Sequence, residues 1–242
     1  IYSHDHPGGG GSDSCFEIRD DCHDITLSDF TLSTSRWGLM IHNHAVGGGE
    51  MPYNLSISNG TIGGNTAACF GIEVGRYDAT PVADLNIVLE DIVINDTNSG
   101  GGVWLLDSGA EALVGGIFRR VHSFGVTQRP GDLRGTATFQ NCVFYGGYST
   151  KCWFGGTPTF YNCTFYRPAT YALETAAGCT GVTMRNCILY STGTRTVNMA
   201  AIIGIDMDYN LHYTAGANPV TGLAYVWDGV AYNWAGWKTN SS

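Results

Sequence analysis

Basic residues are scarce in this chain of 242 residues. Lysine and arginine together number 12 against 21 aspartate and glutamate residues, which gives a formal net charge of −9. A chain with so little positive charge is poorly suited to non-specific binding of nucleic acid or of an anionic membrane surface. Long apolar runs are also missing, and because a spanning helix needs roughly 18 such residues, we expect no insertion into a membrane.

Helical periodicity is missing as well. No stretch repeats its apolar residues with the period of an α-helix over three turns. The chain has instead 34 glycine, 13 tyrosine, 10 phenylalanine and 6 tryptophan residues, a composition rich in turn formers and aromatic side chains. This combination favours an all-β fold.

One short phrase occurs three times between residues 136 and 190. Its copies read FQNCVFY (139–145), FYNCTFY (160–166) and MRNCILY (184–190), and their Asn-Cys pairs lie 21 and 24 residues apart (162−141 and 186−162). Self-similarity at a period of this size indicates a repeat architecture, in which each unit contacts its neighbours along one axis. The chain is therefore predicted to be a solenoid.

The asparagine of each phrase interrupts the alternation of apolar and polar residues. Apolar residues lie two before it, one after it and three after it, which predicts two short strands joined by a one-residue bend. Asparagine tolerates the left-handed backbone conformation that such a bend requires. We therefore predict that Asn141, Asn162 and Asn186 are corners that lie over one another in successive coils.

The same template finds further coils towards both ends of the chain. The predicted corners, in chain order, are Asp29, Asn59, Asp91, Arg120, Asn141, Asn162, Asn186 and Asp208. By subtraction they lie 30, 32, 29, 21, 21, 24 and 22 residues apart. Eight coils of about 21 residues, with insertions of roughly ten residues in the first three intervals, thus account for most of the chain.

This pattern resembles the right-handed parallel β-helix superfamily, the pectate-lyase-like fold of many polysaccharide lyases, pectin-type hydrolases and phage tailspikes. The resemblance covers residues 15–213 and implies an all-β, single-stranded right-handed parallel β-helix of about eight coils. Residues 1–14 are expected to form an N-terminal loop. Residues 214–242 are rich in tryptophan, similar to the tail of secreted bacterial β-helix proteins, and are expected to form an aromatic cap over the last coil.

The resemblance also implies an extracellular location, either secreted or on the cell surface. The chain begins at Ile1 without an initiator methionine or a signal peptide, so we expect a processed product or a piece of a longer protein.

Eight cysteines raise the question of disulfides. Cys142, Cys163 and Cys187 should point into the core from coils about 4.8 Å apart. This spacing exceeds the Cβ separation of ~3.5–4.5 Å that a disulfide needs, so we expect a ladder of buried thiols. Cys15 and Cys22, near the start of the chain, are the expected disulfide pair.

A second set of strands follows the corners and predicts an outward-facing row. Alternation places Leu39, Ile72, Val103, Leu173 and Val197 inward. The expected outward row comprises Met40, Glu73, Trp104, Glu174 and Asn198, with Trp153 in this row or the adjacent one. Aromatic faces and carboxylates on a flat sheet suit a carbohydrate ligand. In the alternative interpretation, the tryptophans pack beneath the long loops at 45–53 and 77–84.

Long insertions place further candidate residues in the N-terminal half, because loops on a rigid scaffold often carry binding and catalytic groups. The candidates there are Arg76 and Tyr77 for substrate binding and His42, Glu73 and Asp107 for catalysis. The outward row adds Trp104, Trp153 and Glu174 as candidates for substrate binding. His42 and His44 can act as a pair of general bases or as ligands on one side of a metal ion. Alternatively, they are ordinary polar residues.

Three aspartates cluster before the first corner, at Asp20, Asp21 and Asp24. Dense carboxylates suit Ca²⁺, although three fall short of the six or more oxygen ligands that this ion takes. Calcium is therefore the cofactor that the sequence suggests, while the identity of a metal and its ligands stays open.

The stretch VTQRPGDLRG (126–135) looks like the pectate-lyase element in which two arginines five residues apart bracket a proline. In this resemblance Arg129 matches the catalytic base and Arg134 the substrate-binding arginine. Two departures put the match in doubt: Pro130 directly follows Arg129 instead of standing two residues beyond it, and residues 103–107 only faintly echo that family's Trp-Ile-Asp-His element.

Two functions follow as expectations. The first is an extracellular β-helix that engages polysaccharide, including a lyase that cleaves an acidic glycan by β-elimination. The second is a non-catalytic spike, adhesin or filament subunit that trimerises or stacks end to end. The sequence leaves open whether the chain is an enzyme.

Overall fold

A computed structural model of the chain shows an all-β architecture. The structure describes residues 14–19, 21–33, 37–43, 51–63, 70–76, 85–95, 101–107, 114–152, 156–166, 168–176, 178–193, 195–200, 204–215, 225–227, 230–233 and 235. No helix in these ranges is long and apolar enough to cross a membrane.

The strands are long at the start of the chain and short towards its end. They are β1 (Ser14–Arg19), β2 (His23–Ser33), β3 (Trp37–His42), β4 (Tyr53–Gly63), β5 (Phe70–Arg76), β6 (Ile87–Asn95), β7 (Gly101–Asp107), β8 (Val114–Val126), β9 (Gly131–Leu133), β10 (Thr136–Gln140), β11 (Val143–Gly146), β12 (Thr150–Cys152), β13 (Thr159–Tyr161), β14 (Thr164–Tyr166), β15 (Leu173–Thr175), β16 (Val182–Arg185), β17 (Ile188–Ser191), β18 (Val197–Met199), β19 (Ile205–Asp208), β20 (Leu211–Thr214), β21 (Tyr225–Trp227) and β22 (Val230–Tyr232).

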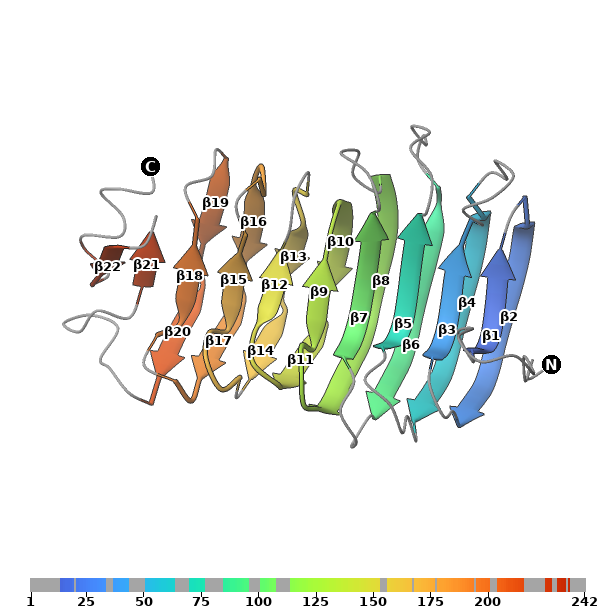
Figure 1. The fold of residues 1–242 in the computed structure, drawn as a ribbon, viewed down its shortest axis with the longest axis horizontal. Helices are drawn as coiled ribbons and strands as arrows, with labels where there is room; N and C mark the ends of the chain where they lie inside the picture. The colour runs from blue at the N-terminus through green and yellow to red at the C-terminus, as the bar shows by residue number, and fades with distance from the viewer. Residues whose placement is uncertain are drawn as a thin grey trace, which may run out of the picture.

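The chain alternates between two sheets that run along the whole molecule (Figure 1). Sheet A has the order β1-β3-β5-β7-β9-β12-β15-β18-β21-β22 within the described residues and faces the viewer in Figure 1. Sheet B lies behind it and contains β2, β4, β6, β8, β10, β11, β13, β14, β16, β17, β19 and β20. Neighbouring strands from successive passes pair in parallel, which is compatible with a β-helix.

Sheet A ends in a hairpin. Strand β21 pairs in parallel with β18, and β22 then pairs antiparallel with β21.

A column of residues in the left-handed conformation bends sheet B. The residues Asp29, Asn59, Asp91, Arg120, Asn141, Asn162, Asn186 and Tyr209 all have φ between 51° and 56°. Seven of the eight predicted corners are therefore confirmed. The prediction of Asp208 is wrong: Asp208 pairs with Arg185 at the end of a strand, so the bend falls one residue later, at Tyr209.

Arg120 is unusual among the corners, because arginine rarely adopts the left-handed conformation that asparagine and aspartate tolerate. Its guanidinium group spans the carboxylate of Asp91, the corner of the preceding pass, with Nε–Oδ1 and Nη2–Oδ2 distances of 2.6 and 2.8 Å. It also contacts Glu90. These contacts hold the arginine in the column and raise its pKa further above the usual range.

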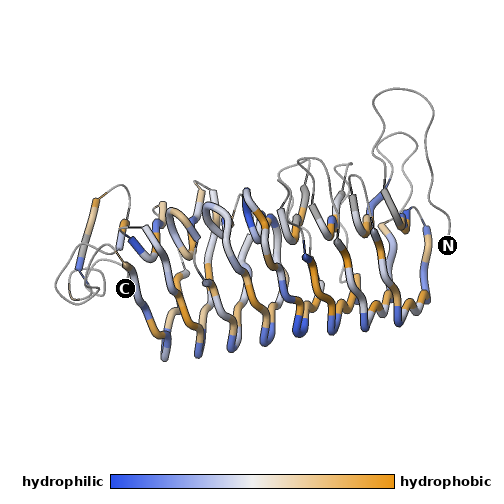
Figure 2. Tube along the Cα trace, turned by 90° about the horizontal axis from the view of Figure 1, so that it is seen from below, coloured by the Kyte–Doolittle hydropathy of each residue, from blue (hydrophilic) through white to orange (hydrophobic). Residues whose placement is uncertain are grey.

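A second column of left-handed residues, which the sequence reasoning missed, lies five residues before the first three corners. Asp24, Asn54 and Asn86 have φ of 55°, 53° and 46°. The Asn54 amide donates to Asp24 over 3.1 Å and the Asn86 amide donates to Asn54 over 3.0 Å. Each early pass therefore bends at both ends of the segment that leads to its corner. Figure 2 shows the result as regularly spaced hydrophilic turning points along one edge.

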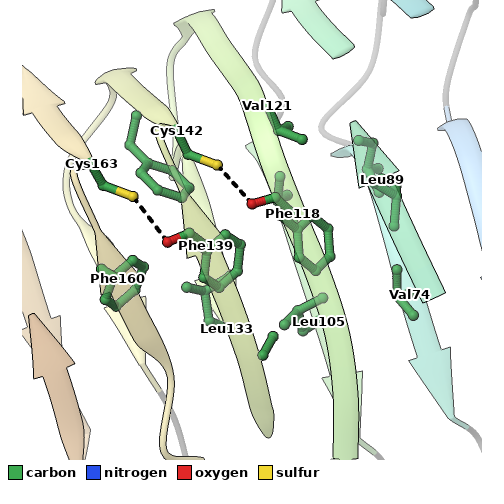
Figure 3. Close-up of a cluster of buried hydrophobic side chains, with 14 of the residues drawn as sticks. Val74, Leu89, Leu105, Phe118, Val121, Leu133, Phe139, Cys142, Phe160 and Cys163 are labelled. Carbon is green, nitrogen blue, oxygen red and sulfur yellow. Dashed lines mark hydrogen bonds between the residues drawn. The ribbon is translucent and has the colours of Figure 1, made fainter. Parts of the chain in front are cut away.

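Side chains of one kind stack in columns inside the molecule. The rings of Phe118, Phe139 and Phe160 lie 4.8 and 5.1 Å apart at nearly parallel angles. Beside them run the thiols shown in Figure 3, which are buried and free, as predicted. The thiols of Cys142, Cys163 and Cys187 donate to the carbonyl oxygens of Phe118, Phe139 and Phe160 over 3.4, 3.4 and 3.6 Å.

The expected disulfide between Cys15 and Cys22 is wrong, because Cys22 is a free thiol. Cys15 belongs to β1 in sheet A, whereas Cys22 leads into β2 in sheet B and packs against the core.

Glycines make room where the interior is tightest. At Gly60, the ring of Phe30 from the preceding strand occupies the space of a side chain, and an added Cβ would lie 2.1 Å from Cζ. At Gly71 in sheet A, an added Cβ would lie 2.3 Å from Cγ2 of Ile94 in sheet B. Both positions therefore require a residue without a side chain.

Candidate functional site

Register places one residue of each sheet A strand in a single file on the face that points away from the core. In chain order this file, which we term the sheet A row, is Glu17, Met40, Glu73, Trp104, Asp132, Lys151, Glu174 and Asn198. The flanking residues Leu39 and Ile41 belong to the hydrophobic core and Met40 does not, which fixes the direction of the row.

The register brings together all five residues that alternation assigned to this row. It adds Glu17, Asp132 and Lys151, which the sequence reasoning did not place there. Strands β9 and β12 have only three residues each, too few for alternation to be visible. Spacing from the corner does not reveal Lys151 either, because it lies 10 residues after Asn141 (151−141) whereas Glu174 lies 12 after Asn162 (174−162).

In the N-terminal half, two members of the row are closed to solvent. The exposed fractions of Met40 and Glu73 are 2% and 0%. His42 is also buried there, and its Nε2 lies 2.7 Å from Oε1 of Glu17 while its Nδ1 lies 3.1 Å from the carbonyl oxygen of Asn43.

His42 therefore sits in an acidic setting. Burial opposes its charged form, but the hydrogen bonds to Glu17 and Asn43, together with the charges of Glu17 and Glu73, raise the pKa of His42 above its usual value. The arrangement favours an imidazolium that holds β3 to β1 over a base that is free to attack a ligand.

In the C-terminal half the row is polar and partly open. Nη1 of Arg129 lies 2.5 Å from Oδ2 of Asp132, and Nζ of Lys151 lies 3.6 Å from Oε1 of Glu174. Ser149 donates to the other oxygen of Glu174 over 2.8 Å. The side chains of Lys151 and Glu174 are 16% and 23% exposed. This segment thus presents paired charges of both signs to solvent.

The two arginines of the lyase-like element lie apart. Arg129 precedes the three-residue strand β9 and Arg134 follows it, so β9 separates them. The guanidinium of Arg129 is one-third exposed and engaged by Asp132. The structure therefore brings Arg129 to the sheet A row through its ion pair with Asp132.

Other sequence-predicted residues are placed by backbone alone or not at all. Arg76 and Asp107 are paired in register on β5 and β7, and Trp104 pairs with Glu73. The side chains of Arg76, Trp104 and Asp107, as well as all of Tyr77, Trp153 and His44, lie outside the described residues.

The acidic cluster considered for calcium is engaged in other contacts. The carboxylate of Asp24 lies 2.7 Å from Nδ1 of His23 and accepts the Asn54 amide. The hydrogen bond with His23, followed by that with Asn54, lowers the pKa of Asp24. Among the residues that the structure describes, no group of three or more His, Cys, Asp and Glu side chains could hold a metal ion, and Asp20 lies outside that part of the chain.

A second outward file, on sheet B, was not anticipated. It consists of aromatic rings on the strands that follow the corners, and we term it the aromatic ladder: Phe124, Tyr145, Tyr166, Tyr190 and Tyr213. Successive ring centroids lie 6.1, 5.6, 4.9 and 4.8 Å apart. The signal in the sequence was the tyrosine that closes every copy of the repeated phrase, three residues after an inward cysteine.

No protein-family model, curated protein or solved structure matches this chain. The two outward files are therefore the features of this chain that indicate a function.

Proposed function

We propose that the protein is an extracellular β-helix that binds polysaccharide along the C-terminal half of the sheet A row. In this proposal the fold is a single-stranded right-handed parallel β-helix of about eight coils. The eight left-handed corners and the alternation between two parallel sheets support it. Hairpin β21–β22 would close the last coil as a cap, because an antiparallel strand ends the parallel stacking.

The observation that carries the proposal is the unbroken polar file Asp132, Lys151, Glu174 and Asn198. Neighbouring members are about 4.8 Å apart along the axis, because that is the spacing of paired strands. The file offers carboxylate acceptors, an ammonium donor and an amide that does both. Sugar hydroxyl groups both donate and accept, so a glycan that runs along the axis meets a partner at every strand.

Binding without cleavage is the function that this geometry supports best. Asp132 and Glu174 each face a cation, and His42 is buried beside Glu17. A general base must reach the proton that it removes, and these groups are engaged by protein partners. We therefore favour an adhesive or structural role, in which the protein trimerises or stacks into filaments while it displays the row.

One observation favours a lyase as the second candidate. Arg129 contacts Asp132, and Lys151 stands next to Asp132 on the adjacent strand, so two cations border one point of the row. Cations of this kind can neutralise a uronate carboxylate and make the neighbouring proton removable. Abstraction of that proton and departure of the β-oxygen would leave an unsaturated uronate.

The binding proposal is tested by affinity electrophoresis in gels that contain polygalacturonate or alginate. We expect retardation in at least one gel, and a loss of retardation for Lys151→Ala and Glu174→Gln. Thr138→Ala, an outward substitution on β10 of sheet B, is the matched control. Equal retardation of all variants would refute binding at the sheet A row.

The lyase candidate is tested by following the absorbance of unsaturated uronate during incubation with polygalacturonate, alginate and glycosaminoglycans. Arg129→Ala should abolish any activity, and activity that survives this change would refute a catalytic role of Arg129. Light scattering of the intact chain measures the self-association that the adhesive role requires.

A further inference from the structure

The aromatic ladder lies on strands of sheet B, whereas the sheet A row lies on strands of sheet A (Figure 1). Register confirms that its tyrosines are neighbours: Tyr145 pairs with Tyr166, Tyr166 with Tyr190 and Tyr190 with Tyr213. The ladder therefore cannot belong to the polar site, and its role must be argued separately.

The rings are arranged like overlapping tiles. Two rings in full face contact are about 3.5 Å apart. The centroids of Tyr190 and Tyr213 are 4.8 Å apart at an interplanar angle of 12°, so the rings are offset and part of each face stays uncovered. Tyr166 and Tyr213 are accordingly 37% and 50% exposed.

A second file accompanies the ladder on the same strands, two residues closer to the corners. Its members are His122, Val143, Thr164, Ile188 and Leu211. None of the ten residues in the two files is Asp, Glu, Lys or Arg. Exposure is high at the C-terminal end, where Ile188 and Leu211 are 43% and 63% exposed. Exposed apolar surface of this extent on one face marks an interaction site.

The residue types in the two files favour one class of ligand. A nucleic acid or an acidic glycan needs cationic partners, which these files lack, and the protein as a whole has a net charge of −9. Tyrosine combines an apolar ring with a hydroxyl group, which matches the apolar faces and hydroxyl edges of pyranose rings. One ring per strand, over five strands, matches a linear polymer along the axis.

We propose that the aromatic ladder binds a neutral, linear polysaccharide, with successive sugar rings against the uncovered faces of Tyr145, Tyr166, Tyr190 and Tyr213. This site is distinct from the proposed binding on sheet A and does not depend on it. The hydroxyl groups at the ring edges hydrogen-bond to the sugars, and Val143, Ile188 and Leu211 of the second file cover their apolar side.

The experiment measures binding of soluble neutral glycans, namely galactomannan, xyloglucan and glucan oligosaccharides, by affinity electrophoresis and calorimetry. The perturbing variant is Tyr166→Ala/Tyr190→Ala, and the control is Thr138→Ala, the outward substitution on β10 that lies in neither file. We expect the double variant to bind the retained glycan about tenfold more weakly, and the control to bind it unchanged. Tyr166→Phe/Tyr190→Phe keeps the rings and should lose less affinity than the alanine variant.

Three outcomes would overturn the proposal. One is binding of no neutral glycan, or binding that the alanine variant leaves intact. Another is an equal loss of binding in Lys151→Ala, which would place the neutral glycan on sheet A. The third is a wild-type oligomer that dissociates in the alanine variant, as seen by light scattering, which would assign the ladder to a second copy of the chain. If circular dichroism shows that the double variant does not fold, Tyr213→Ala at the exposed end of the ladder replaces it.

Discussion

Replacing Gly60 by alanine tests whether columns of stacked residues hold this fold together. An added Cβ would lie 2.1, 2.5 and 2.6 Å from Cζ, Cε2 and Cε1 of Phe30. Non-bonded carbons prefer about 3.5–4.0 Å, so the ring must move by more than an ångström. Phe30 is buried in the core, and overpacking of this kind costs about 1–3 kcal/mol. Alanine restricts the unfolded chain and returns about 0.4–1 kcal/mol. We therefore expect a net loss of roughly 1–2 kcal/mol in the free energy of unfolding.

The cause is identified by a double-mutant cycle. Phe30→Leu lacks all three atoms that meet the new Cβ, so Gly60→Ala should cost little in that background. The expected coupling is about 1–2 kcal/mol, within the range for residues in direct contact. Urea unfolding at 25 °C followed by circular dichroism gives the four free energies. The control is Ser58→Ala on the outward face of β4, which should change stability by less than about 0.5 kcal/mol. An equal effect of Gly60→Ala in both backgrounds would refute the packing argument.

Three further predictions concern His42, the corner residue Asn162 and the free thiols. The raised pKa of His42 means that its contact with Glu17 stabilises the fold below about pH 6.5, the unfolded value, and is lost as pH rises through the higher folded value. The urea midpoint should therefore fall from pH 6 to pH 8 and should do so less in His42→Gln. Asn162→Val should destabilise the protein by about 1–3 kcal/mol in thermal or urea unfolding, because a β-branched residue is strained at φ 55°, whereas Asn162→Gly should be close to neutral. Pulse alkylation with mass spectrometry should modify Cys22 before Cys163, since Cys163 is fully buried; labelling in the reverse order would contradict the described core.

The corners could be predicted because three copies of one phrase show the same break in alternation. Tyr209 was missed because tyrosine is not a residue that favours the left-handed conformation, and the aspartate before it is a better turn former. The column that begins at Asp24 was missed for another reason: its residues are the second residue of a strand or stand just before one, so there is no alternation ahead of them to interrupt. A bend can be recognised from sequence only where alternating apolar residues on both sides of it show which side chains point into the core.

The outward files show the same limit. Met40 and Glu73 could be assigned to the sheet A row because their strands are six and seven residues long. Asp132 stands in a strand of three residues and becomes part of the row only through its neighbours. That Met40 and Glu73 are buried while Lys151 and Glu174 are partly exposed depends on side chains far away in the sequence, which periodicity does not report.

Strand β8 lies between the coils with long strands that precede it and the coils with short strands that follow it. It matches the long strand β6 in a register that continues through the corner, but its register shifts both against β10, between Thr136 and Thr138, and against β11, between Phe144 and Gly146. In a molecule stabilised by nearest-neighbour contacts, such discontinuities divide the chain into units that can melt one at a time. Gradual denaturation should accordingly show two cooperative steps. One is the unfolding of the coils before β8, and the other is the unfolding of the coils after β8, which carry Cys142, Cys163 and Cys187.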